Sequence, residues 1–173
     1  MNLYACATNN SVSHTSKSDK LPNQLMHSSW EVNGRAILQY EEDAVSARFN
    51  WLQDNDLFKC IISGPLGMDV VAFKGDNSGI FEITSDDNQS NLYRILEEDL
   101  PVNDIKFWLQ GLPNPHSSYT QITQDQDFFE FDQNNWKIII NKYQRINAYH
   151  LPKNIQIKNS ALSLKISIDR WRL

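Results

Sequence analysis

The sequence predicts a single, mainly β domain of the α+β class, in which a curved antiparallel sheet or barrel of roughly ten strands is covered by helices. Two observations lead to this prediction. Long segments near both ends of the chain alternate between apolar and polar residues, which is typical of strands with one buried and one solvated face. A central stretch breaks the alternation and has helical spacing instead. With 173 residues, 40% of them hydrophobic, the chain can form one core but not two enzyme domains.

The N-terminal residues 1–20 are polar and have no periodicity, which favours a flexible tether. Within them, Leu3-Tyr-Ala-Cys6 resembles the lipobox of bacterial lipoproteins, in which the cysteine is acylated. Only five residues precede Cys6, fewer than a signal peptide needs. From the tetrapeptide alone, a chance match and a lipid-anchored Cys6 both remain open. The second cysteine, Cys60, lies in an apolar run and is expected to be a buried small hydrophobe.

The strand pattern begins after residues 21–27, which are compatible with a short helix. Residues 30–40 and 45–51 alternate strictly, with a turn centred on Asp43 between them, and the same alternation returns in residues 162–169. Their apolar positions should form the inner face of the sheet. Shorter strands, separated by Gly, Asp and Asn turns, are expected at 58–62, 69–73, 80–83, 128–131, 136–143 and 155–158.

Two helices are expected in the middle of the chain. Residues 86–100 have helical spacing and are followed by a proline. Residues 102–109 form a second, shorter helix, capped by Asn103 or Asp104 and stopped by Gly111. Helices inserted between the two halves of a sheet can cover it, and a lid over an open end tends to leave an apolar cavity.

The net charge and the missing catalytic motifs argue against several classes of function. The net charge of −5, from 16 basic and 21 acidic residues, argues against nucleic acid as a partner. Metal-ligand spacings, a nucleophile elbow and phosphate-binding glycine loops do not occur in the sequence. The carboxylate clusters at 41–42 and 97–99 are better explained as solvated surface than as acid and base catalysts. The sequence therefore favours a protein that is not an enzyme and uses no metal or cofactor.

The C-terminal end is strongly basic. From Trp136 onward there are eight Lys and Arg residues and a single acidic residue, Asp169. Solvent-facing lysines on strands explain this pattern without any function. The alternative is a basic face that meets an acidic partner or lipid headgroups.

The segment Gly64-Pro65-Leu66-Gly67, between two strands, is not explained by packing alone. Proline at the second position and glycine at the fourth suit a type I turn, which places Leu66 at its outermost corner. An exposed apolar tip suggests contact with something apolar. The alternative is that Leu66 folds back onto the sheet, or that a lone surface leucine has no role.

Several motifs in order from about Ser29 to the C-terminus resemble the LolB family of outer-membrane lipoprotein receptors. Gly-Pro-Leu-Gly followed at this distance by Trp-Leu-x-Gly-Leu-Pro is the most specific combination. The motifs are Trp30-x-x-x-Gly34-Arg35, Ala47-Arg48-Phe49-x-Trp51, Gly64-Pro-Leu-Gly67, Leu100-Pro101, Trp108-Leu109-x-Gly111-Leu-Pro113, Asn135-Trp136-Lys-Ile138 and Lys165-Ile-x-Ile-x-x-Trp171.

This resemblance implies an unclosed antiparallel barrel of roughly ten to eleven strands with a helical lid over an apolar cavity. Residues 1–20 would be a truncated signal and lipobox remnant with a tether, and residues 21–173 a single lipoprotein-binding domain. The protein would be a monomer, lipid-anchored at the periplasmic face of the Gram-negative outer membrane. Its partners would be a LolA-type carrier, the acyl chains of outer-membrane lipoproteins and outer-membrane lipid.

The resemblance also assigns candidate site residues. Cys6 would be the lipid anchor, and Gly64, Pro65, Leu66 and Gly67 the loop that inserts into the membrane. For Trp51 and Trp108, which are among the cavity residues, the alternative is that they are ordinary core residues. The acyl-binding cavity and its lid would be formed by Phe49, Trp51, Phe73, Ile95, Leu96, Trp108 and Leu109.

Two other functions stay open on the sequence. A LolA-like soluble carrier would have no use for a membrane-seeking Leu66. A lipocalin-like binder of a small apolar ligand would need a closed barrel without a tethered N-terminus.

Overall fold

The computed structural model describes residues 29–40, 42–64, 67, 70–85 and 100–173. These residues form ten strands and one helix, α2 (Val102–Leu109). The predicted helix at 21–27 lies outside the described residues, as do residues 86–99 of the predicted helix 86–100; Leu100, which is described, is not helical. The strands are β1 (Ser29–Tyr40), β2 (Asp43–Asp54), β3 (Leu57–Ser63), β4 (Val71–Asp76), β5 (Gly79–Ser85), β6 (Tyr119–Gln124), β7 (Phe129–Gln133), β8 (Trp136–Ile146), β9 (Tyr149–Lys158) and β10 (Leu162–Arg172).

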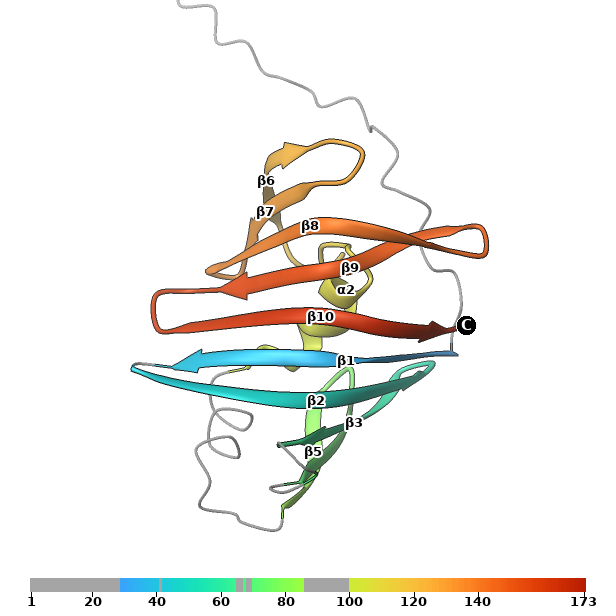
Figure 1. The fold of residues 1–173 in the computed structure, drawn as a ribbon, viewed down its shortest axis with the longest axis vertical. Coiled ribbons are helices and arrows are strands. Elements are labelled where there is room, and N and C mark those ends of the chain that lie inside the picture. The colour runs from blue at the N-terminus through green and yellow to red at the C-terminus, as the bar shows by residue number, and fades with distance from the viewer. Residues whose placement is uncertain (1–28, 41, 65–66, 68–69, 86–99) are drawn as a thin grey trace, which may run out of the picture.

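All ten strands belong to one antiparallel sheet with the order β5-β4-β3-β2-β1-β10-β9-β8-β7-β6 (Figure 1). The chain builds one half of the sheet from β1 to β5 and the other from β6 to β10, and β1 pairs with β10 to join the halves. Because β5 and β6 lie at opposite ends of this order, the sheet is not closed. The expected fold class, a mainly β unclosed antiparallel barrel, is confirmed.

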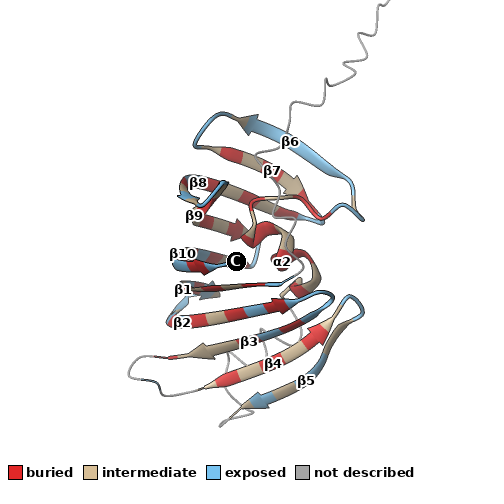
Figure 2. Cartoon of the chain, turned by 90° about the vertical axis from the view of Figure 1, so that its right-hand side faces the viewer, coloured by how far each residue is buried: buried red, intermediate tan, exposed pale blue. Residues whose placement is uncertain are grey.

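Helix α2 lies on the concave side of the curved sheet (Figure 2). The helix has the predicted residues, but its predicted side-chain caps are wrong. Pro101 occupies the N-cap position and no side chain caps the helix, while Asp104 lies in its first turn. Asp104 instead accepts hydrogen bonds from the side chains of Asn114 and Asn134, at 2.5 and 2.9 Å.

The predicted alternation in β1, β2 and β10 sets the inner face of the sheet. In the β1–β2 register, Val32 lies opposite Trp51 and Gly34 opposite Phe49, and all four are buried. Their neighbours along each strand point to the outer face, because side chains alternate along a strand. The core is therefore the volume between this inner face and α2.

One strand, β6, was not predicted. Five of its six residues are exposed, so neither face of the strand is buried and the sequence has no apolar alternation there. β6 is held by its antiparallel pairing with β7 alone and forms one edge of the sheet. β9 also begins earlier than predicted, at Tyr149.

Candidate apolar binding cavity

An apolar cavity of about 70 Å³ lies between the inner face of the sheet and α2. Every residue that lines it is apolar. Strands β1 to β4 and β10 supply most of the wall, and α2 together with Leu100, just before it, supplies the rest. The lining residues are Ala36, Leu38, Val45, Ala47, Phe49, Trp51, Cys60, Ile62, Phe73, Leu100, Ile105, Leu109, Leu164 and Ile166.

Aromatic rings fix one end of this cavity. Trp51 stacks on Phe58 with their ring centroids 4.9 Å apart, and Phe73 meets both rings edge-on at 6.2 and 6.1 Å. The indole N–H of Trp51 donates to Gln53 Oε1 at 3.0 Å, and the amide of Gln53 donates in turn to the Asn55 carbonyl. Because the only polar atom of the Trp51 ring is satisfied by Gln53, the cluster offers no unpaired donor to the cavity.

Cys60 completes the apolar wall. Its thiol is free, its side chain is 3% exposed, and burial raises its pKa well above the ordinary value. The thiol therefore stays protonated at neutral pH, and an uncharged, buried thiol behaves as a small hydrophobe rather than as a nucleophile.

The structure brings four of the expected cavity residues together: Phe49, Trp51, Phe73 and Leu109 line the same volume. Ile95 and Leu96 lie outside the described residues. Sequence reasoning did not name the small and aliphatic members of the wall, although the alternation had already placed most of them on the inner faces. These are Ala36, Leu38, Val45, Ala47, Ile62, Leu100, Ile105, Leu164 and Ile166.

Trp108 lies elsewhere, on the side of α2 that faces β7 and β8. Its ring centroid is 6.3 Å from that of Trp136, and its indole N–H donates to Gln133 Oε1 at 2.9 Å. Gln133 is 2% exposed and also bonds the backbone of Asn114 and Ser117. Trp108 therefore fastens α2 to the sheet and does not line the cavity.

The loop between β3 and β4 is described only in part. Gly64 is buried and Gly67 is exposed, and the Gly67 N–H donates to the Gly64 carbonyl at 3.2 Å. This bond joins the first and fourth residues of a turn, as the sequence pattern suggested. Gly67 has a φ of 76°, a left-handed conformation that favours glycine. Pro65 and Leu66 lie outside the described residues, as does Cys6.

The outer face of the sheet carries a polar cluster of its own. Glu31 on β1 accepts hydrogen bonds from Arg172 at 2.7 Å and from Asn50 at 2.7 Å. The Arg172 bond, followed by the Asn50 bond, holds the pKa of the Glu31 carboxyl below its ordinary value of 4.5. No cluster of three or more His, Cys, Asp or Glu residues able to hold a metal ion occurs in the described part of the chain.

A wall of this kind suits an acyl chain or another aliphatic group, because nothing in it could orient a polar ligand. Its volume, about 70 Å³, is well below the roughly 300 Å³ at which ligand pockets begin. Binding a whole acyl chain therefore requires that the side chains of the wall or α2 move. None of the helices among the described residues is long and apolar enough to cross a membrane.

Comparisons of the sequence with a family model and with known proteins give the same family. A family model described as "Outer membrane lipoprotein LolB" matches residues 28–171. A protein named "Outer-membrane lipoprotein LolB" from Marinomonas sp. (strain MWYL1) is 28% identical over 156 residues, which cover 84% of this chain and 81% of the relative. One of the same name from Francisella tularensis subsp. tularensis (strain FSC 198) is 29% identical over 160 residues, covering 87% and 77%.

Among solved structures, the fold is similar to that of the LolA superfamily protein NE2245 from Nitrosomonas europaea. The TM-score is 0.53, with 9% sequence identity, over 87% of this chain and 88% of that chain. At this identity the likeness concerns the fold alone.

Proposed function

Because the chain belongs to the LolB family, as its motifs indicated, we propose that it is an outer-membrane lipoprotein receptor. It accepts acylated lipoproteins from a LolA-type carrier and inserts them into the inner leaflet of the outer membrane. The observation that carries this proposal is the apolar cavity between the sheet and α2.

The energetics favour a protected transfer. Each methylene removed from water is worth about 0.8 kcal/mol, so one acyl chain of about 16 carbons corresponds to roughly 12 kcal/mol. Release of such a chain into water is therefore strongly unfavourable. A receptor whose cavity binds acyl chains better than the donor does, and less well than the bilayer, can pass them on without nucleotide hydrolysis.

Two further residues have roles in this proposal. Cys6 is the lipid anchor that holds the receptor at the periplasmic face of the membrane. Leu66, in the turn that Gly64 and Gly67 close, enters the bilayer when cargo is released. A leucine removed from water is worth about 1.5 to 3 kcal/mol, which is enough to bias a loop toward lipid and too little to anchor the protein.

The basic C-terminal third docks the acidic surface of the carrier. Lys142 on β8 is exposed, and Lys158 on β9 is half-buried. Lys153, also on β9, donates to the backbone carbonyl of Ile168. Exposed charges more than about 8 Å apart are screened at physiological ionic strength, so these lysines act mainly on the association rate.

A two-step assay tests the proposed function, following a labelled lipoprotein from the carrier to the receptor and then to liposomes. The cavity variant is Ala47→Leu, which fills space that the cargo needs. Its control is Ser46→Leu, which adds the same side chain to the outer face of the same strand. Ala47→Leu should accept at least about tenfold less cargo, a loss of 1.4 kcal/mol or more, with its fold intact by circular dichroism. If both variants accept cargo like the wild type, the cavity is not the binding site.

A further inference from the structure

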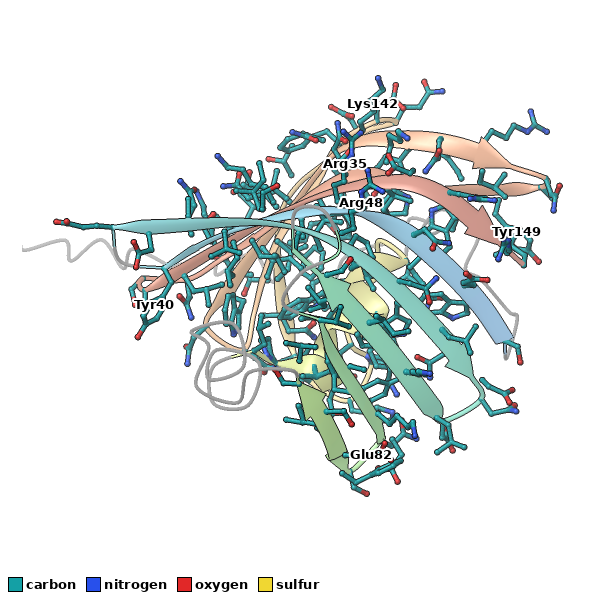
Figure 3. The ribbon with its side chains drawn as sticks, turned by 60° about the horizontal axis from the view of Figure 1, so that its bottom comes forward. Arg35, Tyr40, Arg48, Glu82, Lys142 and Tyr149 are labelled. Carbon is teal, nitrogen blue, oxygen red and sulfur yellow. The ribbon has the colours of Figure 1, made fainter. Side chains whose placement is uncertain are left out.

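A groove of about 480 Å³ lies on the outer face of the sheet, over β1, β2, β3 and β10. Three arginines line it: Arg35 on β1, Arg48 on β2 and Arg170 on β10. Figure 3 shows Arg35 and Arg48 on the side of the sheet turned away from α2. The groove is therefore separate from the apolar cavity, although Phe49 contributes to the wall of both.

The placement of these arginines destabilises the folded sheet. Arg35 and Arg48 are register partners on neighbouring antiparallel strands, and like charges directly opposite each other destabilise a sheet. Among the described residues that line the groove, Asp169 is the one carboxylate, and its Oδ1 lies 3.3 Å from Arg35 Nη2. Within the described residues, the side chains of Arg48 and Arg170 have no hydrogen-bond or ion-pair partner. The groove thus contains three guanidinium groups and one carboxylate, and that carboxylate pairs with Arg35 alone.

The neighbouring carboxylate of Glu31 does not neutralise this excess charge. It is engaged by Arg172 at 2.7 Å and by Asn50 at 2.7 Å. The Asn50 amide also donates to Asn33 Oδ1 at 2.6 Å, so both asparagines in the groove are held in fixed positions.

A β-bulge places two of the groove residues. Asn33 pairs with Arg170 and the next residue, Gly34, pairs with Ile168, so Asp169 is an extra residue in β10. Consecutive strand residues normally point to opposite faces, but here Asp169 and Arg170 both line the groove. Bulges that redirect side chains in this way are common next to binding sites.

We propose that this groove binds the phosphate of a membrane lipid headgroup. Guanidinium groups bind phosphate through paired, charge-assisted hydrogen bonds, and a groove with excess positive charge attracts it. The position of the groove favours a lipid phosphate over a free phosphate. Ser63 lines the groove and directly precedes Gly64, where the loop that is proposed to enter the membrane begins. This inference rests on the proposed insertion of that loop, which brings the lipid phosphates to the base of the loop.

The test measures binding of the folded protein to vesicles of phosphatidylethanolamine and phosphatidylglycerol. The test variant is Arg35→Gln/Arg48→Gln, and the matched control is Lys59→Gln/Lys74→Gln, which removes the same charge from solvent-accessible side chains outside the groove and outside the basic C-terminal third. The arginine variant should lose about tenfold or more in vesicle affinity and the control less than about threefold. A third variant, Arg35→Lys/Arg48→Lys, keeps the charge and should still lose most of the affinity.

Each other outcome overturns the inference. Equal losses of vesicle affinity in Arg35→Gln/Arg48→Gln and in the lysine-to-glutamine control would mean that net charge alone attracts the membrane. Full affinity in the arginine variant would mean that the groove binds no lipid. Inorganic phosphate binding in the groove that vesicles do not displace would assign the site to free phosphate.

Acceptance of cargo from the carrier, measured without vesicles, separates this inference from the proposed function. The arginine variant should accept cargo at the wild-type rate. If the wild type itself accepts no cargo, the proposed function fails, whatever the vesicle result. Urea unfolding checks that all variants are folded.

Discussion

The ring of Phe49 packs directly against Gly34, its register partner on β1. A methyl group on Gly34 would lie 2.7 Å from Phe49 Cε1 and 2.4 Å from the backbone oxygen of Ser167. Both distances are shorter than real carbon contacts allow, so the missing side chain of Gly34 creates the space that Phe49 fills. Phe49 in turn lines the apolar cavity, so this contact sets part of the cavity wall.

Gly34→Ala should therefore destabilise the protein. The new methyl group must displace the Phe49 ring and a backbone oxygen in the centre of the sheet, at a cost of about 1–3 kcal/mol. Urea unfolding monitored by circular dichroism measures this cost. Ser46→Ala, on the outer face of β2, is the control and should change stability by less than about 0.5 kcal/mol. Equal stabilities for both variants would show that the sheet adjusts freely at Gly34.

Gln133→Leu should be more damaging than its conservative size suggests. Gln133 bonds the Trp108 indole N–H and both backbone groups of Asn114, all at 2.8–2.9 Å, and the Ser117 carbonyl at 3.0 Å. Leucine leaves these groups unpaired in a buried place, where each costs about 1–3 kcal/mol.

We expect Gln133→Leu to lower the free energy of unfolding by at least about 3 kcal/mol, since more than one buried group loses its partner. Gln121→Leu, on the exposed strand β6, is the matched control for the same chemical change. A Gln133→Leu protein as stable as this control would mean that the network contributes nothing to holding α2.

The pH dependence of stability should reveal the Glu31–Arg172 pair. The folded state lowers the pKa of Glu31 below 4.5, so the ionised carboxylate stabilises the fold above that pH. This stabilisation is lost as the pH falls through the lowered pKa, because the folded protein must then take up the proton.

Glu31→Gln should therefore be less stable than the wild type at neutral pH, with a difference that shrinks below pH 4.5 and vanishes at the acid limit. Urea unfolding across this range measures the difference. Glu82→Gln removes a carboxylate from an exposed pair with Lys74 and should have little effect at any pH. A Glu31→Gln deficit that is constant with pH would assign the effect to lost packing rather than to charge.

Leu66→Glu separates the two halves of the proposed transfer. A turn tip contributes little to the core, so folding and acceptance of cargo from the carrier should stay near the wild-type level. Release into liposomes should fall at least about tenfold, because a charged tip does not enter the bilayer. Cargo would then accumulate on the mutant receptor. Loss of the first step, or release at the wild-type rate, would make Leu66 a structural or neutral residue.

Strict alternation made most of the sheet predictable from the sequence. The inner positions of β1, β2 and β10 followed from it, and with them much of the cavity wall, such as Ala47 and Leu164. β6 was missed for the same reason: it is exposed on both faces, so burial leaves no pattern in its sequence.

The roles of single residues around α2 were harder to predict. Trp108 and Leu109 are adjacent and apolar, but one residue turns a helix by about 100°, so Leu109 lines the cavity while Trp108 faces Gln133. Gln133 itself is a polar residue on a short strand, which a sequence pattern assigns to the surface. Only the contact between α2 and β7, which are far apart in sequence, makes it a buried anchor.

In the proposed function, the acyl chain of a lipoprotein enters the cavity between the sheet and α2. This placement of the acyl chain is tested most directly by loading the receptor from its carrier with a lipoprotein whose acyl chain carries a photoactivatable group, and by mapping the adducts on β2 by mass spectrometry. We expect adducts on Val45, Ala47 and Phe49, which line the cavity, and none on Ser46 and Arg48, which point to the outer face. Adducts on Ser46 and Arg48 without any on the inner residues, from a loaded and folded receptor, would contradict this placement.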